Sequence, residues 1–344
     1  MDKRLYDHIL GSLACSAIGD AMGAGTEILT EDEIVRLFGK RATDFQMPPA
    51  CHPHSGGREA GQITDDASLT FYLARAYVEA GGEMTLDLAV KTILAWSENS
   101  DYYPRFAGPA TMEAVMRLRK GDDPIEVGRH GEISLNGVTN GAAMKISPAG
   151  LMHPGDLDAA IEDAITICLP THGTQLAMSG AAAVACAVSE GLRAGSSVFS
   201  VIRAAQYGAR RGEELGRQRG RIAAGPSVID RLDLAISLAL QERDADEACR
   251  KIGRVVGSGL PIGEAVPAAL GIFLAMDGDP RRTIEWGANI GDDTDTVACI
   301  AGAVAGAWAG IEKTPEELYR QVVKINHLDL EGLAAQMESI VSAR

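Results

Sequence analysis

The sequence predicts an all-α protein, a large single-domain orthogonal helical bundle over residues 1–344. Apolar residues recur with a period near 3.6 along most of the chain, as they do on one face of a helix, and the strict alternation of a half-buried strand is almost absent. No long linker and no change in composition divides the chain. One large domain is therefore favoured over two small ones.

The apolar periodicity and the intervening turn dipeptides place each helix in order. We expect helices at residues 6–23, 31–38, 66–80, 85–98, 109–120, 157–168, 172–193, 196–212, 228–241, 263–276, 292–311, 315–325 and 330–341. In the helix at 292–311, Gly302, Gly306 and Gly310 lie on one face, which predicts close packing against another helix. The longest irregular stretch, residues 39–63, has a length that is often functional in a compact domain.

Composition and charge exclude several classes of protein. Hydrophobic residues make up 46% of the chain, which rules out a disordered protein. The 47 acidic residues outnumber the 32 basic ones, and the net charge of −15 would repel a phosphate backbone. General nucleic-acid binding is therefore not expected. One arginine-rich stretch is expected to form a solvated face or a loop, and it contains Arg210, Arg211, Arg217, Arg219 and Arg221.

The cysteines and apolar segments indicate where the protein resides. The 6 cysteines form no CxxC pair and most lie in apolar helical segments, as expected of buried, reduced thiols rather than disulfides or a zinc framework. The first residues carry no signal-peptide pattern. The most apolar stretch, residues 297–311, is shorter than the roughly 20 residues of a membrane span. We expect a cytoplasmic protein with no membrane segment.

Common catalytic motifs are absent, whereas acidic residues stand beside threonines in two clusters. The chain has no GxxxxGK loop, no GxGxxG turn and no GxSxG elbow, so nucleophilic catalysis by Ser or Cys has no support. The clusters are Thr64-Asp65-Asp66 and Asp292-Asp293-Thr294-Asp295-Thr296, each at the start of a predicted helix. Either one alone could be an N-cap, because Asp and Thr accept hydrogen bonds from a first helical turn.

Two features of the clusters favour metal binding over capping. Three aspartates within four positions exceed what one cap uses, and the apolar helices that follow imply burial of both clusters. Buried carboxylates without a partner cost several kcal/mol each, and no Lys or Arg lies near either cluster in the sequence. Mg²⁺ takes carboxylate and hydroxyl oxygens as ligands, and two clusters suggest two ions. The scattered histidines disfavour zinc.

Five motifs in order resemble those of the ADP-ribosylglycohydrolase family, which includes the dinitrogenase reductase-activating glycohydrolases. The resemblance spans residues 5–312 and rests on Gly19-Asp20-Ala21-Met22-Gly23 with Glu27, on Gly61-Gln62-Ile63-Thr64-Asp65-Asp66, on Thr139-Asn140-Gly141-Ala142-Ala143-Met144, on Thr171-His172, and on Gly291 with Asp293-Thr294-Asp295-Thr296. It implies an all-α fold with a dinuclear Mg²⁺ or Mn²⁺ centre in a cleft.

The resemblance also implies roles for particular residues. The metal ligands would be Thr64, Asp65, Asp66, Asp293, Asp295 and Thr296. Glu27 and Asp65 would be catalytic, and Glu27 matches an acid that gates the site and contacts a metal or its water. The substrate-binding residues would be Gly108, Asn136, Gly137, Val138, Thr139, Asn140, Gly141 and His172, with 136–141 lining the ribose and diphosphate and His172 near the adenine.

The chain departs from the family pattern in three places. Where the family has Gly-Gly-Asp, this chain has Gly-Asp-Asp, and Asp292 adds a negative charge beside the metals. Lys145 replaces a common arginine. At 106–108, Phe-Ala-Gly replaces the Asp-Ile-Gly of some arginine-deribosylating members. The nearby Asp101 could substitute, but this difference weakens the case for arginine as the leaving group.

The activity that the resemblance implies is metal-dependent hydrolysis of the ribosyl N- or O-glycosidic bond of an ADP-ribosylated acceptor, a protein or a small molecule, with release of ADP-ribose. Such cleavage has an oxocarbenium-like transition state that nearby carboxylates stabilise, and an acid such as Glu27 can accept a proton from water. Two alternatives stay open at this point. They are an N-ribosidase acting on a nucleoside-like substrate and a non-catalytic ADP-ribose-binding relative.

Overall fold

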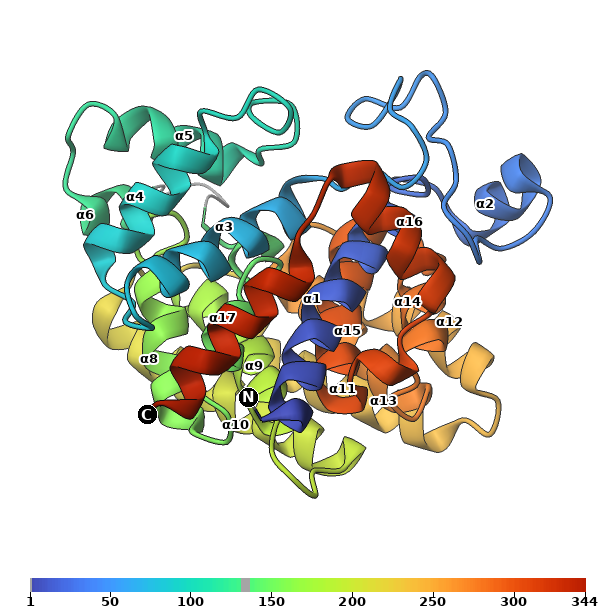
Figure 1. Cartoon of the computed structure of the whole chain (residues 1–344). Coiled ribbons are helices and arrows are strands. Elements are labelled where there is room, and N and C mark those ends of the chain that lie inside the picture. The colour runs from blue at the N-terminus through green and yellow to red at the C-terminus, as the bar shows by residue number, and fades with distance from the viewer. Residues whose placement is uncertain (1, 131–136) are drawn as a thin grey trace.

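The computed structural model describes residues 2–130 and 137–344, and these residues form helices without a β-strand (Figure 1). The helices are α1 (Lys3–Gly23), α2 (Glu31–Phe38), α3 (Asp65–Glu79), α4 (Leu86–Trp96), α5 (Pro109–Leu118), α6 (Pro124–Arg129), α7 (Ser147–Leu151), α8 (Leu157–Cys168), α9 (Gln175–Gly191), α10 (Val198–Arg219), α11 (Val228–Gln241), α12 (Ala245–Val255), α13 (Ile262–Ala275), α14 (Pro280–Gly287), α15 (Thr294–Ala309), α16 (Glu316–Asn326) and α17 (Leu330–Ser342), with 3₁₀ turns η1 (Asn140–Ala142) and η2 (Ile311–Lys313). The all-α prediction is confirmed.

The periodicity fails to predict four of these helices, each for a physical reason. Helices α6 and α7 have 6 and 5 residues, too few to display a helical period. Helix α12 buries only Ala248, Cys249 and Ile252, so its apolar stripe is narrow. Helix α14 begins with a proline after an aspartate cap, a start signal that does not depend on apolar spacing.

The arginine-rich stretch is mainly an exposed helical face. Helix α10 runs to Arg219 rather than ending near residue 212. Arg217 pairs with Glu213 at 2.7 Å, one turn before it, and Arg211 pairs with Glu214 at 2.9 Å. These pairs hold the charges on the solvent side of the helix. The expectation of a solvated face is confirmed, whereas the predicted end of the helix is wrong.

Helices α1 and α15 pack side by side in antiparallel orientation (Figure 1). A Cβ atom on Gly306 would lie 2.1 Å from the carbonyl oxygen of Gly11, so only glycine permits this approach of the two backbones. At the other end of the contact, a Cβ atom on Gly23 would lie 2.3 Å from the Cα atom of Asp295. The close packing predicted for the glycine face of α15 is confirmed, and it joins the end of α1 to the start of α15.

Two apolar clusters surround the elements that carry the acidic motifs. The larger cluster extends from α1 to α17 and includes α9, whose residues are buried throughout. The smaller cluster lies around Trp96 and joins α3 to α4 and α5. Residues 39–64 contain no helix, as expected for the long irregular stretch. No helix within the described residues is long and apolar enough to cross a membrane.

Replacing Gly306 with alanine tests the contact between α1 and α15. The added methyl group would overlap the Gly11 carbonyl, and we expect a loss of stability of about 1–3 kcal/mol, as for overpacked cores. Denaturant unfolding measures this change. The matched control is Gly253→Ala in α12, where a Cβ atom would meet Ile290 at 3.0 Å. Because alanine favours helices over glycine by roughly 1 kcal/mol, the control should be neutral or stabilising. Equal effects of the two substitutions would contradict the contact.

Candidate metal and substrate site

The two acidic clusters begin helices α3 and α15, and neither is used as a helix cap. Thr64 and Asp293 occupy the N-cap positions, yet neither side chain accepts a hydrogen bond from its own helix. The capping alternative therefore does not account for the clusters. Four of their five carboxylates, those of Asp65, Asp66, Asp293 and Asp295, instead line a cavity of about 290 Å³, whereas Asp292 is exposed and lies outside the lining.

Most of the predicted site residues meet in this one cavity. Its walls include Glu27, Asp65, Asp66, Gly108, Thr139, Asn140, Gly141, His172, Asp293, Asp295 and Thr296. Thr64, Gly137 and Val138 are buried and do not belong to its lining. Asn136 lies outside the described residues. Asp101 is exposed and also lies apart from the cavity wall.

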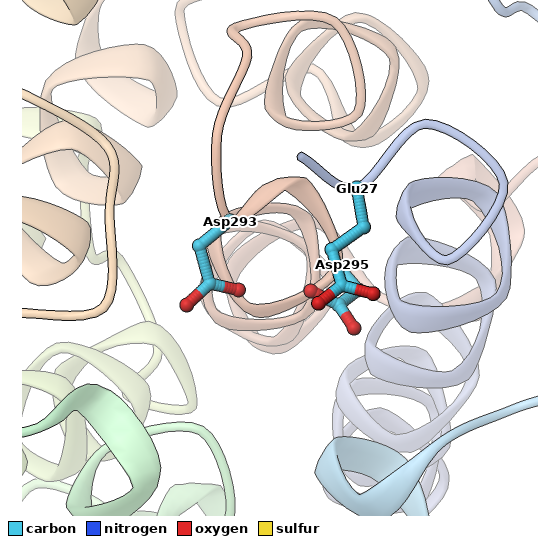
Figure 2. A group of neighbouring side chains, drawn as sticks. All are labelled: Glu27, Asp293 and Asp295. Carbon is cyan, nitrogen blue, oxygen red and sulfur yellow. The ribbon is translucent and has the colours of Figure 1, made fainter. Parts of the chain in front are cut away.

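Glu27, Asp293 and Asp295 form the tightest acidic group. One carboxylate oxygen from each lies within 4.8 Å of the others, which is close enough for all three to bind one ion. Figure 2 shows the Glu27 and Asp295 side chains overlapping in this view, with Asp293 beside them; Glu27 comes from the segment after α1, and both aspartates come from the start of α15. The close packing of α1 on α15 therefore assembles this group.

Asp20, near the end of α1, positions the other acidic cluster. Its carboxylate accepts hydrogen bonds from the backbone N–H and the hydroxyl of Thr64, at 3.0 and 2.7 Å, and from the N–H of Ala67 at 2.9 Å. Asp20 therefore caps α3 from a different helix. This contact leaves Asp65 and Asp66 free to face the cavity.

The backbone fixes the turn that carries Glu27 against the turn that carries Asp293. The N–H of Ile28 donates to the carbonyl of Asp292 at 2.7 Å, and the N–H of Asp292 donates to the carbonyl of Leu29 at 3.2 Å. Ile28 and Asp292 have φ values of 60° and 62°, a conformation that is strained for isoleucine. These reciprocal bonds hold the strained conformation in place.

A second wall of the cavity consists of residues 139–141 and His172. Asn140 donates to Asp293 through its side-chain amide at 2.6 Å, and its own N–H donates to the Leu260 carbonyl at 2.9 Å. His172 is buried, and its Nε2 lies 3.0 Å from the Thr139 hydroxyl. Burial lowers the pKa of His172 well below its ordinary value, so the ring is neutral. This wall is polar but carries no net charge.

The third wall comes from residues 106–112 and from His54. Gly108 is the N-cap residue of α5, and a Cβ atom there would meet nothing within 4 Å. Phe106 lies between two arginines, with the Cζ atoms of Arg58 and Arg105 at 4.7 and 5.5 Å from the ring centroid. Phe106 and His54 line the cavity themselves. This wall is therefore apolar, with cations next to it.

Burial and mutual repulsion raise the pKa values of the acids. Burial, followed by the charges of Asp293 and Asp65, raises the pKa of Glu27 to about 8. Burial raises the pKa of Asp20 to about 6, although its hydrogen bonds oppose the shift. Burial is also the largest cause of pKa values well above the ordinary one at Asp65, Asp66 and Asp295.

Two cations, the buried Lys145 and the partly buried Arg58, lie near the acids and offset their charge only in part. Lys145 is 3% exposed, donates to the Gly141 carbonyl, and opposes the raised pKa of Asp65. The positive charge of Arg58 likewise opposes the raised pKa of Asp20. The acidic groups outnumber these two cations. The cavity therefore has an excess of negative charge at its acidic end.

Divalent cations fit this donor set. Within the described residues, the buried oxygens Glu27 Oε2 and Asp66 Oδ1 have no hydrogen-bond partner, and His52 Nε2 lies 3.6 Å from the former. Buried carboxylate oxygens without partners are costly, and a hard cation would satisfy them. The hydroxyl of Thr64 already donates to Asp20, so it could bind an ion only through a remaining lone pair.

Sequence reasoning did not predict the roles of His52, His54 and Asp20. His52 is buried, and its Nε2 lies 3.0 Å from the carbonyl oxygen of Glu27. Its place in the long irregular stretch 39–63 was the only signal available. Asp20 belongs to the first motif of the family resemblance, but its spacing alone favours the end of a helix with no role in the site.

Comparison with known proteins identifies the family. The ADP-ribosylglycohydrolase family model matches residues 1–343. The chain belongs to this family. The chain is similar to ADP-ribosylhydrolase ARH3 of Homo sapiens, with 26% identity over 91% of this chain and 88% of the relative. It is also similar to ADP-ribosyl-[dinitrogen reductase] glycohydrolase of Rhodospirillum rubrum, with 25% identity over 90% of this chain and 88% of the relative.

Two further comparisons extend across nearly the whole chain. The uncharacterized protein YegU of Escherichia coli (strain K12) is 31% identical over 96% of each chain. A solved structure described as an ADP-ribosylglycohydrolase-related protein complex has a TM-score of 0.69 and 22% identity, over 98% of this chain and 99% of that one. The latter likeness shows that the ADP-ribosylglycohydrolase fold is shared. Family membership indicates a hydrolase that acts on ADP-ribosyl compounds.

The metal-free protein should become more stable as the pH falls. The folded-state pKa of Glu27 is raised from 4.5 to about 8, so its contribution to stability is present below the unfolded pKa and lost as the pH rises through about 8. Asp20, whose pKa is raised to about 6, likewise contributes stability at low pH that is lost as the pH rises through about 6. Thermal melts in a chelator at successive pH values measure this dependence.

The control is the same series of melts with excess Mg²⁺. Bound cations stabilise ionised carboxylates, so the rise in stability on acidification should shrink or reverse. A metal-free melting temperature that increases with pH across this window would contradict the raised pKa values.

Proposed function

We propose that the chain hydrolyses the ribosyl N- or O-glycosidic bond of an ADP-ribosylated acceptor, a protein or a small molecule, and releases ADP-ribose with the help of two divalent cations, Mg²⁺ or Mn²⁺. The observation that carries the proposal is the convergence of acids from three parts of the chain in one cavity that continues to the uncharged wall of Asn140 and His172. Family membership supports the ADP-ribosyl chemistry.

The oxygen donors of the two clusters would hold the ions. They are the carboxylates of Asp65, Asp66, Asp293 and Asp295 and the hydroxyls of Thr64 and Thr296, with Glu27 adjoining them. When bound, such ions polarise ribose hydroxyls and lower the pKa of water. Asp20 and Asn140 keep this donor set in place, because Asp20 holds the start of α3 and Asn140 holds the carboxylate of Asp293.

Glu27 is suited to move the proton of the attacking water. Its Oε2 atom is buried, belongs to a residue in the cavity wall and lacks a hydrogen-bond partner. Its carboxylate can accept a proton from the water that attacks the anomeric carbon, and bound cations would favour this ionised form. The bond to the acceptor breaks as the water adds, and the proton passes to the departing acceptor, so that the products are ADP-ribose and the free acceptor. Asp65 lies in the same wall and stabilises the positive charge that develops on the ribose.

The uncharged wall is suited to bind the rest of ADP-ribose. The acids would repel a diphosphate, so neutral donors must offset that repulsion. Backbone close to Gly108 and Gly141 can approach a ligand because neither residue carries a side chain, and a Cβ atom on Gly141 would already lie 3.1 Å from the His172 ring. The neutral ring of His172 adds a polar contact without charge.

A nucleoside-like substrate is the second candidate. The cavity volume of about 290 Å³ is at the lower end of the range of roughly 300–1,000 Å³ for small-molecule sites, which favours a compact substrate. An N-ribosidase of this kind would release free ribose from a nucleoside. The products therefore distinguish the two candidates.

Replacing Asp66 or Asp293 with asparagine tests the metal site and the activity together. Each variant should lose the release of ADP-ribose from ADP-ribosylated proteins or peptides, because ion binding requires both clusters. The metal-free variant should melt at a higher temperature than the metal-free parent, because each substitution removes a charge that repels the neighbouring acids. Added Mn²⁺ or Mg²⁺ should raise the melting temperature of the parent and have little effect on the variants.

The control is Asp244→Asn, at an exposed helix cap outside the cavity. It should keep its metal response and its activity. Full metal content in both site variants would overturn the ligand assignment.

Replacing Glu27 with glutamine separates catalysis from binding. The amide keeps the size of the side chain but cannot accept the proton, so turnover should fall on the order of 10²–10⁴-fold, whereas ADP-ribose affinity should change much less. Steady-state kinetics and calorimetric titration with ADP-ribose measure the two quantities. Glu59→Gln, at an exposed position of the same irregular stretch as His52, is the control. Loss of rate and affinity by equal factors would make Glu27 a ligand or a gate, and unchanged turnover would exclude it from the reaction.

A further inference from the structure

The exposed residues of the cavity lining are His54, Pro109 and Leu260, and they mark its mouth. Arg105 is also exposed and donates to the carbonyl of His54. Leu260 is 47% exposed and apolar. An acceptor outside the cavity therefore meets a cation and apolar surface at the mouth.

Arg58, Phe106 and Arg105 form a group that we call the cationic wall. The guanidinium groups of both arginines lie against the Phe106 ring. Arg105 donates to the carbonyls of His54 and Gly56, each at 2.5 Å. These contacts join the irregular stretch 39–63 to the loop before α5 and fix the exposed Arg105 next to His54 and Phe106 of the cavity lining, whereas Arg58 lies deeper, near Asp20.

Within the described residues, neither arginine of the cationic wall forms an ion pair, although Arg58 lies near enough to Asp20 to oppose the raised pKa of that carboxyl. Arg58 donates to the carbonyls of Ile63 and Asp101, at 2.6 and 3.4 Å, and its buried Nε has no hydrogen-bond partner among the described residues. Neither Arg58 nor Arg105 forms an ion pair with a carboxylate of residues 2–130 or 137–344. Most other arginines do, as Arg41 does with Glu31 at 2.7 Å. Unpaired arginines are notable in a chain with a net charge of −15.

The size of the cavity determines which part of a substrate can reach this wall. A cavity of about 290 Å³ cannot admit a protein, so a protein acceptor must stay outside and contact the exposed mouth. The ADP-ribose moiety would occupy the buried part, beside Asn140 and His172. The exposed Arg105 is therefore placed toward the acceptor rather than toward the diphosphate.

We propose that the cationic wall recognises the acceptor and favours acceptors with negatively charged groups next to the ADP-ribosylated residue. This inference rests on the proposed function. The net charge of the chain repels such acceptors at long range, so the wall acts at short range, where guanidinium groups form charge-assisted hydrogen bonds with carboxylates or phosphates. The acidic end of the cavity would otherwise make an anionic acceptor unfavourable.

Two ADP-ribosylated peptides that differ only in their flanking residues test the proposal. One carries two glutamates and the other two lysines beside the modified residue, and the pair is prepared once with ADP-ribose on serine and once on arginine. We expect the kcat/KM of the unmodified enzyme to be about two- to fivefold higher per charge for the glutamate peptide, as for exposed ion pairs. The preference should weaken at high salt.

Variants of Arg105 assign the preference to the wall. In Arg105→Gln, the ratio of kcat/KM for the glutamate peptide to that for the lysine peptide should fall toward one. Arg105→Lys keeps the positive charge and should retain most of this ratio. Arg203→Gln on the exposed face of α10 is the matched control and should retain it fully. The affinity for free ADP-ribose, measured by calorimetry, should be the same in all four proteins. Retention in Arg105→Lys separates the effect of charge from any loss of loop structure.

Three outcomes would overturn the inference. Equal kcat/KM values for the two peptides would exclude acceptor selection by charge while leaving the proposed function intact. A loss of ADP-ribose affinity in Arg105→Gln by the same factor as the loss in kcat/KM would assign the wall to the diphosphate. Release of ADP-ribose from none of the peptides, together with no binding of free ADP-ribose, would overturn the proposed function and this inference with it.

Discussion

The site depends on the contact between the backbones of α1 and α15. Two helices can approach this closely only where glycine replaces a side chain, as at Gly11 and Gly306. Because the helices are antiparallel, the same contact places the end of α1 against the start of α15. Glu27 and Asp295 then share one small volume, although they are far apart in the sequence. Asp20, on the same helix, orients the third acidic segment through Thr64.

This assembly concentrates negative charge that the protein does not neutralise by itself. Lys145 and Arg58 lie behind the acids but are fewer than the carboxyls they face. The result is a set of raised pKa values and of oxygens without partners, which are costly to the folded chain. Buried carboxyl groups that destabilise the folded chain in this way are typical of sites where an ion binds or a reaction takes place. The fold therefore stores in its metal-free state the electrostatic energy that divalent cations would release on binding.

The departures from the family pattern all lie near the mouth of the cavity or behind its acids. Asp292 adopts a left-handed conformation that glycine would adopt without strain, and its carbonyl accepts the N–H of Ile28. Phe106 replaces an acid found in some relatives and lies against two arginines. The proposed metal ligands lie in the motifs that resemble those of the family, whereas Asp292, Lys145 and Phe106 depart from the family pattern.

The sequence alone determined the all-α class, the ordered acidic motifs and the close packing of the glycine face of α15, because these follow from local periodicity and residue type. It could not determine that Asp20 caps α3 or that Asn140 binds Asp293, since these hydrogen bonds join segments separated by 44 and 153 positions. The cationic wall likewise exists only where two distant loops meet at Phe106. Short helices such as α6 and α7 were missed because they are stabilised by packing rather than by their own pattern. Tertiary structure decided which charges meet, because that depends on distances in space that a one-dimensional pattern does not encode.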